Sequence, residues 1–258
     1  MDQDVIEKVI QQVTRELGSS AAPVAPCKND ALGVTEFVGT AIGDTIGLVI
    51  ANVDPTLTEK MNLGKFRSIG IIGGRTGAGP QIMAVDDAVK ATNTEIISVE
   101  LPRDTKGGAG HGNLIYIGAQ DVSDAKRAVE IALDSLPKYF GDVYANDAGH
   151  LEFQYTARAS YCLNKVFNTP LGKSFGLICA GPAAIGTVLA DVAVKAANVE
   201  VVGYSSPSSG TSYSNEVILT ITGDSGAVRQ AVKASIDVGK KLLGALGDAP
   251  KSATTPYI

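Results

Sequence analysis

The chain of 258 residues has few of the residue types on which several common protein functions depend. It has no Trp, only three Cys and two His, and a net charge of −5 without a stripe of Lys and Arg. Nucleic-acid binding needs clustered Lys and Arg to neutralise phosphates, so we predict no nucleic-acid partner. No apolar run approaches a membrane span, and the acidic start, Met1–Asp4, does not resemble a signal peptide. These absences predict a cytosolic protein with no membrane partner.

The cysteines also limit the chemistry that the sequence predicts. Cys27, Cys162 and Cys179 are far apart and show no C-x-x-C spacing, which predicts neither a zinc site nor a disulfide framework. A catalytic thiol would need an imidazole partner, and neither His111 nor His150 lies in a nucleophile motif. We therefore expect no metal, no cofactor and no catalytic residue, and interpret the cysteines as core or linker residues.

The most informative positive feature is a repeated phrase. Residues 88–95 read AVKATNTE and residues 193–200 read AVKAANVE, with six of eight positions identical at an offset of 105 residues. Glu36–Ala41 and Glu152–Ala157 share the pattern E-F-x-x-T-A, which we interpret as a second echo that sets the extent of the copy. A period of about a hundred residues is typical of a domain, so the sequence predicts two copies of one domain.

Each copy has the same predicted order of elements. A strand with period-two alternation and a short apolar run precede a Gly-Pro and an Ala-rich helix. A hairpin with a long Gly- or Ser-rich tip and an amphipathic helix follow. The predicted fold class is α/β (α+β), with an antiparallel-rich sheet and flanking helices in each copy. We place the domains at residues 34–146 and 147–246, and the flanking segments at 1–33 and 247–258.

Residues 4–17 predict an amphipathic helix ahead of the first domain. Its apolar positions fall on one face of a helical wheel, and Gly18 follows them. Ser19–Leu32 reads as a flexible tether. The apolar face has two interpretations, which the sequence leaves open: it packs on its own domain, or it docks on a partner.

Several segments resemble one known family. Ala183–Val199, Val202–Tyr204 and Gly223–Val228 are similar to bacterial microcompartment shell domains, with helix, hairpin and second helix in the same order. The strand ahead of each unit resembles the circularly permuted, tandem-domain branch of that family. Similarity to the propanediol-utilisation group of that branch is carried by Thr35–Asp44, Arg75–Pro80, Leu101–Gly112 and Ala145–His150.

This resemblance implies two tandem ferredoxin-like, circularly permuted shell domains and a structural, non-enzymatic role. It implies homotrimers whose six domains imitate a hexamer and tile, edge to edge with other shell proteins, around encapsulated enzymes. Head-to-tail contacts between identical units close into rings, which agrees with this arrangement. The implied metabolites are small polyols such as 1,2-propanediol or glycerol, and residues 1–17 are candidates for binding the enclosed enzymes.

Two lysines are candidates for the border of the tile. Lys90 and Lys195 hold the position of the edge lysine in single-domain shell proteins, and each lies near a helix C-terminus, which favours a cation. A long apolar stem also lets Lys cover a neighbouring surface. The Pro-Arg-Pro-His edge motif of many single-domain tiles is absent, and an ordinary exposed helix Lys remains the alternative interpretation.

The two hairpin tips align with the loops that surround the pore of shell tiles. Glycines allow a close approach of the backbone to the axis, and polar side chains can replace water around a metabolite. Disordered loops are the alternative interpretation. The predicted pore-lining residues are Arg103, Asp104, Thr105, Lys106, Gly107, Gly108, Gly110, His111, Ser205, Ser206, Ser208, Ser209, Gly210 and Thr211.

The glycine-rich segment 73–79 invites a phosphate-binding interpretation, because it follows a strand and opens a helix. It matches neither phosphate-binding fingerprint, and the second copy lacks it. We favour a polar crevice for a small polyol at Arg75, Thr76 and Gly77. The alternative function, from a different class, is a regulatory or enzymatic α/β protein that binds a small molecule at this segment. The nearby Asp86–Asp87 pair we interpret as surface charge.

Overall fold

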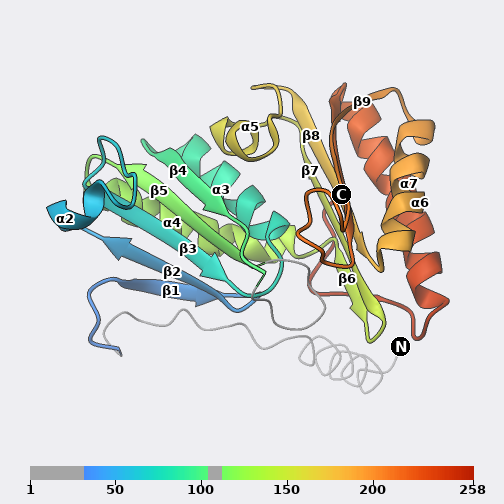
Figure 1. Cartoon of the computed structure of the whole chain (residues 1–258), viewed down its shortest axis with the longest axis horizontal. Coiled ribbons are helices and arrows are strands. Elements are labelled where there is room, and N and C mark those ends of the chain that lie inside the picture. Colours follow the sequence, from blue (N-terminus) through green and yellow to red (C-terminus); the bar gives the residue numbers. More distant parts are fainter. Residues whose placement is uncertain (1–31, 104–111) are drawn as a thin grey trace, which may run out of the picture.

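The computed structural model describes residues 32–103 and 112–258. The predicted helix at residues 4–17, Cys27 and residues 104–111 of the first hairpin tip therefore lie outside the described residues. The described chain forms two domains side by side (Figure 1). Each domain is an antiparallel sheet with two long helices against one face, as the repeat predicts.

The first domain contains a five-stranded sheet in the order β1-β2-β3-β5-β4. Its strands are β1 (Phe37–Ala41), β2 (Thr45–Ile50), β3 (Ser68–Gly74), β4 (Glu95–Glu100) and β5 (Asn113–Ala119). Its helices are α2 (Pro55–Thr58), α3 (Gly79–Ala91) and α4 (Val122–Tyr139). Pro80 stands in the first turn of α3, where its missing N–H costs no intrahelical hydrogen bond.

The second domain contains a six-stranded sheet in the order β11-β6-β7-β8-β10-β9. Its strands are β6 (Val143–Asn146), β7 (Gly149–Thr156), β8 (Ser174–Gly181), β9 (Val199–Ser205), β10 (Val217–Gly223) and β11 (Lys251–Ser252). Its helices are α5 (Tyr161–Phe167), α6 (Ala183–Ala196) and α7 (Ser225–Gly244). The predicted boundary after residue 146 falls inside the β6–β7 hairpin, and strand pairing assigns β6 to the second sheet.

The predicted apolar stripes of α4 and α7 pack on their sheets. Val129 of α4 is fully buried, and a Cβ on Gly70 of β3 would lie only 2.7 Å from its Cγ2. A Cβ on Gly176 of β8 would likewise come too close to the side chains of Val228 and Val232 of α7. Small residues in the central strands therefore let the helices approach closely, which fits the low aromatic content of 5%.

The sheet orders correct one of the sequence echoes. β3 corresponds to β8, so the preceding β1 and β2 correspond to β6 and β7. The E-F-x-x-T-A pattern instead matches β1 with β7, which are not equivalent, so the prediction that this echo sets the extent of the copy is wrong. Half-buried strands select alternating apolar and polar residues wherever they occur, and so short patterns recur in strands at different positions.

The second sheet is covered on both faces, and this joins the two domains. Along β8, Ile178 and Ala180 face the core with α6 and α7, whereas Leu177 and Cys179 join the core of the first domain. Ile82 of α3 belongs to that shared core. Figure 1 shows the first domain on one side of this sheet and α6 and α7 on the other. Among the described residues, no helix is long and apolar enough to cross a membrane.

Candidate functional site

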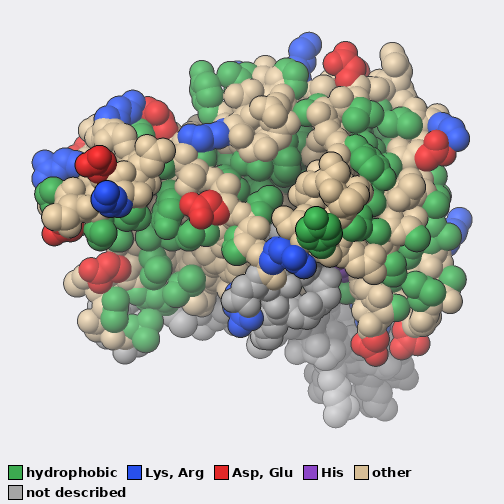
Figure 2. Space-filling view, in the orientation of Figure 1, with side chains coloured by type: hydrophobic (Ala, Val, Ile, Leu, Met, Phe, Trp, Pro, Cys, Tyr) green, Lys and Arg blue, Asp and Glu red, His purple; other side chains and the backbone are tan. Residues whose placement is uncertain are grey.

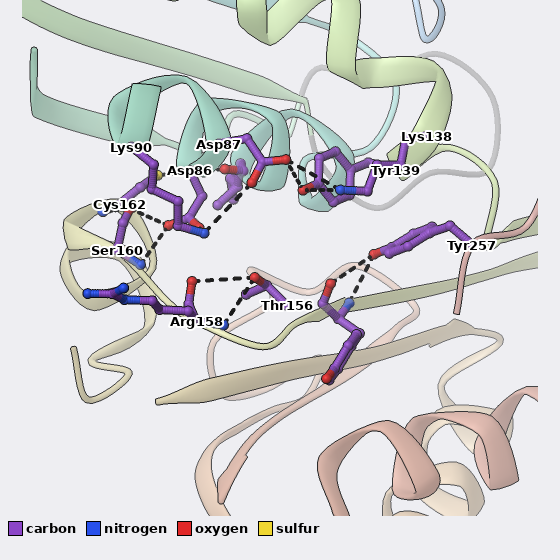
Figure 3. Close-up of polar contacts among 12 residues, drawn as sticks. Asp86, Asp87, Lys90, Lys138, Tyr139, Thr156, Arg158, Ser160, Cys162 and Tyr257 are labelled. Carbon is purple, nitrogen blue, oxygen red and sulfur yellow. Dashed lines mark hydrogen bonds and ion pairs between the residues drawn. The ribbon is translucent and has the colours of Figure 1, made fainter. Parts of the chain in front are cut away.

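The junction between the domains buries an ion pair of α3. Asp86, whose side chain is 0% exposed, lies 2.5 Å from the Nζ of Lys90. It also accepts hydrogen bonds from the backbone N–H of Ser160, at 3.0 Å, and from the Ser160 hydroxyl (Figure 3). Ser160 caps α5 of the other domain, so one carboxylate links the two domains. The interpretation of Asp86 as surface charge is wrong, because the second domain covers it.

The chain ends at this same junction. Asp87 accepts hydrogen bonds from the Tyr139 hydroxyl and, at 3.4 Å, from Lys138, and the Tyr257 ring packs edge-on against Tyr139 (Figure 3). The Tyr257 hydroxyl donates to Gln154 Oε1 of β7 at 3.1 Å. Tyr257, in the segment 247–258, thus closes one end of the domain junction.

The repeat-equivalent pair of the second domain lies on the surface. Lys195 Nζ is 2.7 Å from Asp191, and the two side chains are 73% and 59% exposed. Along α6, Thr187 and Val188 are also exposed, whereas their counterparts at the offset of 105, Ile82 and Met83, are buried. The two predicted edge lysines therefore occupy different surroundings within one chain: Lys90 is partly covered and Lys195 is open.

A crevice of about 560 Å³ opens between the β3–α3 loop and the β6–β7 hairpin. Thr76 and Gly77 line it together with Asn146, His150 and Asn215. The Thr76 hydroxyl donates to the carbonyl of Gly43 at 2.5 Å, so it can only accept a further hydrogen bond. Arg75 is exposed and does not belong to the described lining of the crevice.

Buried amides hold the glycine-rich loop in place. Gln81 donates to Thr45 Oγ1 at 3.0 Å and to the Thr76 carbonyl at 3.2 Å, and Asn113 donates to the Gly77 carbonyl at 3.1 Å. A Cβ on Gly79 would overlap the Glu152 carboxylate, which therefore lies against the first turn of α3. A carboxylate at this helix N-terminus is favourable and opposes a phosphate there. The contacts of this loop are therefore with its own chain, and the Glu152 carboxylate opposes the phosphate of a nucleotide there.

Three further side chains meet beside the crevice. His150 Nε2 lies 3.9 Å from Cys179 Sγ and 3.4 Å from Glu216 Oε2, and Cys179 Sγ lies 3.7 Å from Glu216 Oε2. Burial, followed by the charges of Glu216 and Glu152, raises the pKa of the Cys179 thiol well above its ordinary value. A nucleophilic cysteine needs a lowered pKa, so the raised pKa argues against a catalytic Cys–His dyad here. Sequence spacing missed the cluster, because its members come from β7, from β8 and from the residue before β10.

The second hairpin tip is ordered by its own backbone. Ser206 and Ser209 exchange hydrogen bonds of 2.7 and 2.9 Å, and Gly210 adopts a φ of 102° beside Ser205. The side chains of Ser208 and Ser209 are exposed, whereas Thr211 is buried and its hydroxyl donates to the Ser214 carbonyl at 3.3 Å. The buried Thr211 side chain therefore stabilises the conformation of this loop. In the first tip Arg103 is exposed, and the other predicted positions lie outside the described residues.

Charge on the surface does not gather into a nucleic-acid interface on the face that Figure 2 shows. Lys and Arg side chains are scattered there among Asp and Glu. A phosphate-binding surface needs a basic stripe or patch.

Comparison with known proteins identifies the class. The BMC domain model matches residues 68–147 and 174–248, which are the corresponding parts of the two domains. The chain belongs to the family of bacterial microcompartment shell proteins, and the predicted fold class is confirmed.

The similar proteins narrow this class. The chain is 56% identical to the bacterial microcompartment shell protein PduB of Citrobacter freundii over 266 aligned positions, which cover 99% of this chain and 98% of that protein. It is 55% identical to PduB of Limosilactobacillus reuteri, with 89% and 98% covered. A crystal structure of a trimeric PduB shell protein superposes with a TM-score of 0.84 at 54% identity, covering 87% of this chain and 100% of that one. EtuB from Clostridium kluyveri gives 0.85 at 55% identity, with 87% and 99% covered.

Proposed function

We propose that this chain is a structural tile of a microcompartment shell, and that three chains form a ring of six similar domains. The relatives are shell proteins, and one solved relative is a trimer. The proposal assigns the chain no catalytic residue. It places the tile in the shell of a compartment that processes 1,2-propanediol or glycerol, because the sequence resembles the propanediol-utilisation group and the relatives are PduB proteins.

One structural observation supports the proposed ring of three chains. α3 of the first domain is buried under the second sheet, whereas its repeat equivalent, α6, exposes Val188 and the Asp191–Lys195 pair. If α6 packs on the first sheet of the next chain as α3 packs within the chain, the contact is head-to-tail and repeats until the ring closes. Three chains then bury three copies of α6, and the last turns of α3 and α6, where Lys90 and Lys195 stand, are proposed to face other shell proteins at the border.

The proposed passages for small polar metabolites are the hairpin tips and the crevice. The exposed hydroxyls of Ser208 and Ser209 surround the axis of the ring in this arrangement, with Arg103 from the alternate domains. The crevice offers a second route, where the Thr76 hydroxyl can accept a hydrogen bond and Gly77 lines the wall beside it. A polyol has neighbouring hydroxyl groups that hydrogen-bond to several of these polar groups at once, whereas an apolar solute makes no such bonds. The proposed passages therefore favour polyols over apolar solutes.

The assembly is tested on the purified full chain by negative-stain electron microscopy at rising protein concentration. The proposal expects flat sheets with a hexagonal repeat. A protein that stays dispersed, and that nucleotides stabilise against melting, would instead support the alternative function at segment 73–79.

Polyol passage is tested on crystals soaked in 1,2-propanediol and, separately, in glycerol. The expected result is density for the polyol between the tips or in the crevice beside Thr76. Density confined to contacts between neighbouring molecules would refute the passage without touching the tile proposal.

Residues 1–17 are proposed to attach enclosed enzymes, on the basis of their amphipathic pattern. A chain without residues 1–17 is expected to assemble normally but to leave the enzymes unattached to the shell in cell fractionation. Enzyme attachment equal to that of the full chain would contradict this role.

A further inference from the structure

The cluster of His150, Cys179 and Glu216 has the makings of a metal site. The three side chains supply an imidazole nitrogen, a thiol sulfur and a carboxyl oxygen, and these donor atoms lie within 4.8 Å of one another. Glu216 is 3% exposed and His150 12% exposed, so solvent has little access to any of them. Surface acidic groups often cluster by chance, whereas three different donors in a buried group need a reason.

Strand register brings the cluster together. Cys179 of β8 lies opposite Glu152 of β7 on one side and Ile218 of β10 on the other. His150 and Glu216 each stand two residues from these partners, so both side chains point to the same face as Cys179. Gly181 lies between them, and a Cβ there would come within 2.9 Å of the His150 ring. The missing side chain leaves the space that the imidazole occupies.

The separations of the donor atoms match the edges of a coordination tetrahedron. Bonds of about 2.0 to 2.3 Å from zinc to nitrogen, oxygen and sulfur place neighbouring ligand atoms roughly 3.3 to 3.7 Å apart. The distances here are 3.4 Å for nitrogen to oxygen, 3.7 Å for sulfur to oxygen and 3.9 Å for sulfur to nitrogen. The longer two involve the larger atom, sulfur, as the bond lengths require. A shift of a few tenths of an ångström closes the remaining gap.

We infer that His150, Cys179 and Glu216 bind a divalent transition-metal ion of the zinc type. Mixed nitrogen, sulfur and oxygen donors suit zinc, whereas an all-oxygen set would suit magnesium or calcium. Three protein ligands leave a fourth position, and a cavity of about 50 Å³ lined by the cluster has room for a water molecule there. This inference does not depend on the shell function.

Binding exchanges a proton for the metal. The Cys179 sulfur must be a thiolate to coordinate the metal. When sulfur coordinates the metal, the S–H bond breaks, the proton leaves to solvent and the sulfur–metal bond forms. The metal would cross-link β7, β8 and the start of β10 at the wall shared with the crevice, where His150 lines both spaces.

The test uses the full chain without an affinity tag, stripped with a chelator, dialysed and titrated with Co²⁺ as a spectroscopic substitute for zinc. The expected spectrum has a thiolate-to-cobalt charge-transfer band and intense visible bands of tetrahedral cobalt, both saturating at one ion per chain. Zn²⁺ should displace the cobalt and raise the melting temperature by mass action. If the wild-type chain shows no charge-transfer band, the cluster is a hydrogen-bonded core group and the inference fails.

Two cysteine variants give the matched comparison. Cys179→Ser should abolish the band, whereas Cys162→Ser, at another buried cysteine outside the cluster, should keep it. A band that survives in Cys179→Ser would place the cobalt on a different thiol and overturn the assignment. If Cys179→Ser does not fold, Glu216→Gln decides the matter. The assignment expects cobalt affinity to fall by about tenfold or more, and an unchanged affinity contradicts it.

Discussion

Asp86 and Asp191 show how far one residue's role depends on its surroundings. They hold the same position in the two copies, and each pairs with a lysine four residues later. The four-residue spacing places each aspartate and its lysine on one helix face. It does not predict that Asp86 is buried, because the covering residue, Ser160, is 74 positions away in the chain.

This difference predicts unequal costs of the same substitution. Asp86→Asn removes the charge that Lys90 and Ser160 face inside the junction, and should lower the free energy of unfolding by roughly 2 to 3 kcal/mol. At a protein concentration that keeps the chains single, Asp191→Asn breaks an exposed pair and should cost at most about 0.5 kcal/mol. Urea unfolding of both variants measures this, and equal costs would contradict the buried role of Asp86.

The buried tyrosine at the junction predicts a loss of stability in alkali. Burial, followed by the hydrogen bond to Asp87, raises the pKa of Tyr139 well above its ordinary value of 10.0. Above that pH the unfolded chain loses this proton and the folded chain keeps it. The free energy of unfolding should then fall with rising pH, by about 1.4 kcal/mol per pH unit from this group.

The check is urea unfolding between pH 8 and pH 11, in steps of about half a unit. The variant Tyr139→Phe should start less stable, because it loses the hydrogen bond to Asp87, but its stability should fall less steeply above pH 10. Parallel curves for the two proteins would show that the Tyr139 hydroxyl does not contribute to the alkaline loss.

The cluster at Cys179 illustrates what sequence spacing cannot show. Its members are at positions 150, 179 and 216, and only the pairing of three strands brings them together. Local spacing reveals metal sites built on one loop or helix turn, because there the chain itself fixes the distance between ligands. A site built across a sheet needs the register, and the sequence does not give it.

At the scale of elements, long periodic segments were predicted and short elements were missed. The Gly-Pro starts and apolar stripes predicted α3, α4, α6 and α7, because a long amphipathic pattern allows one periodicity only. The short β2, β6 and α5 lacked such patterns and were not predicted.

Close packing of helix on sheet makes a testable prediction. A Cβ on Gly70 would lie 2.7 Å from Val129 Cγ2 and 3.0 Å from the Ala125 carbonyl oxygen. Gly70→Ala should therefore destabilise the chain by about 1 to 3 kcal/mol through overpacking. The measurement is the midpoint of urea unfolding.

Val129→Ala provides the control, because it removes the side chain that the new methyl group meets. Alone it should destabilise the chain by leaving a cavity. Combined with Gly70→Ala, the loss should be smaller than the sum of the two single losses. Strictly additive losses would mean that the two residues do not compete for the same space.

At the scale of the molecule, the chain contains one finished junction between its two domains and two exposed surfaces for an equivalent junction with another chain. The finished junction packs α3 under the second sheet and closes with Tyr257. The two exposed surfaces are one side of α6, where Val188 is 45% exposed, and the first sheet, where Ile46 is 39% exposed. The sequence repeat predicted two equivalent domains, and the structure shows which face of the second domain stays exposed among residues 32–103 and 112–258.

The mass of the full chain in solution tests this account most directly, by sedimentation equilibrium on the wild type and two variants. The account predicts a particle of three 26.6 kDa chains for the wild type, and dissociation to single chains for Val188→Arg, which puts a charge in the ring contact. Val122→Arg places the same charge at a valine that is 40% exposed on α4, and should leave the trimer intact. A wild-type monomer, or a Val188→Arg protein that remains trimeric, would contradict the head-to-tail ring.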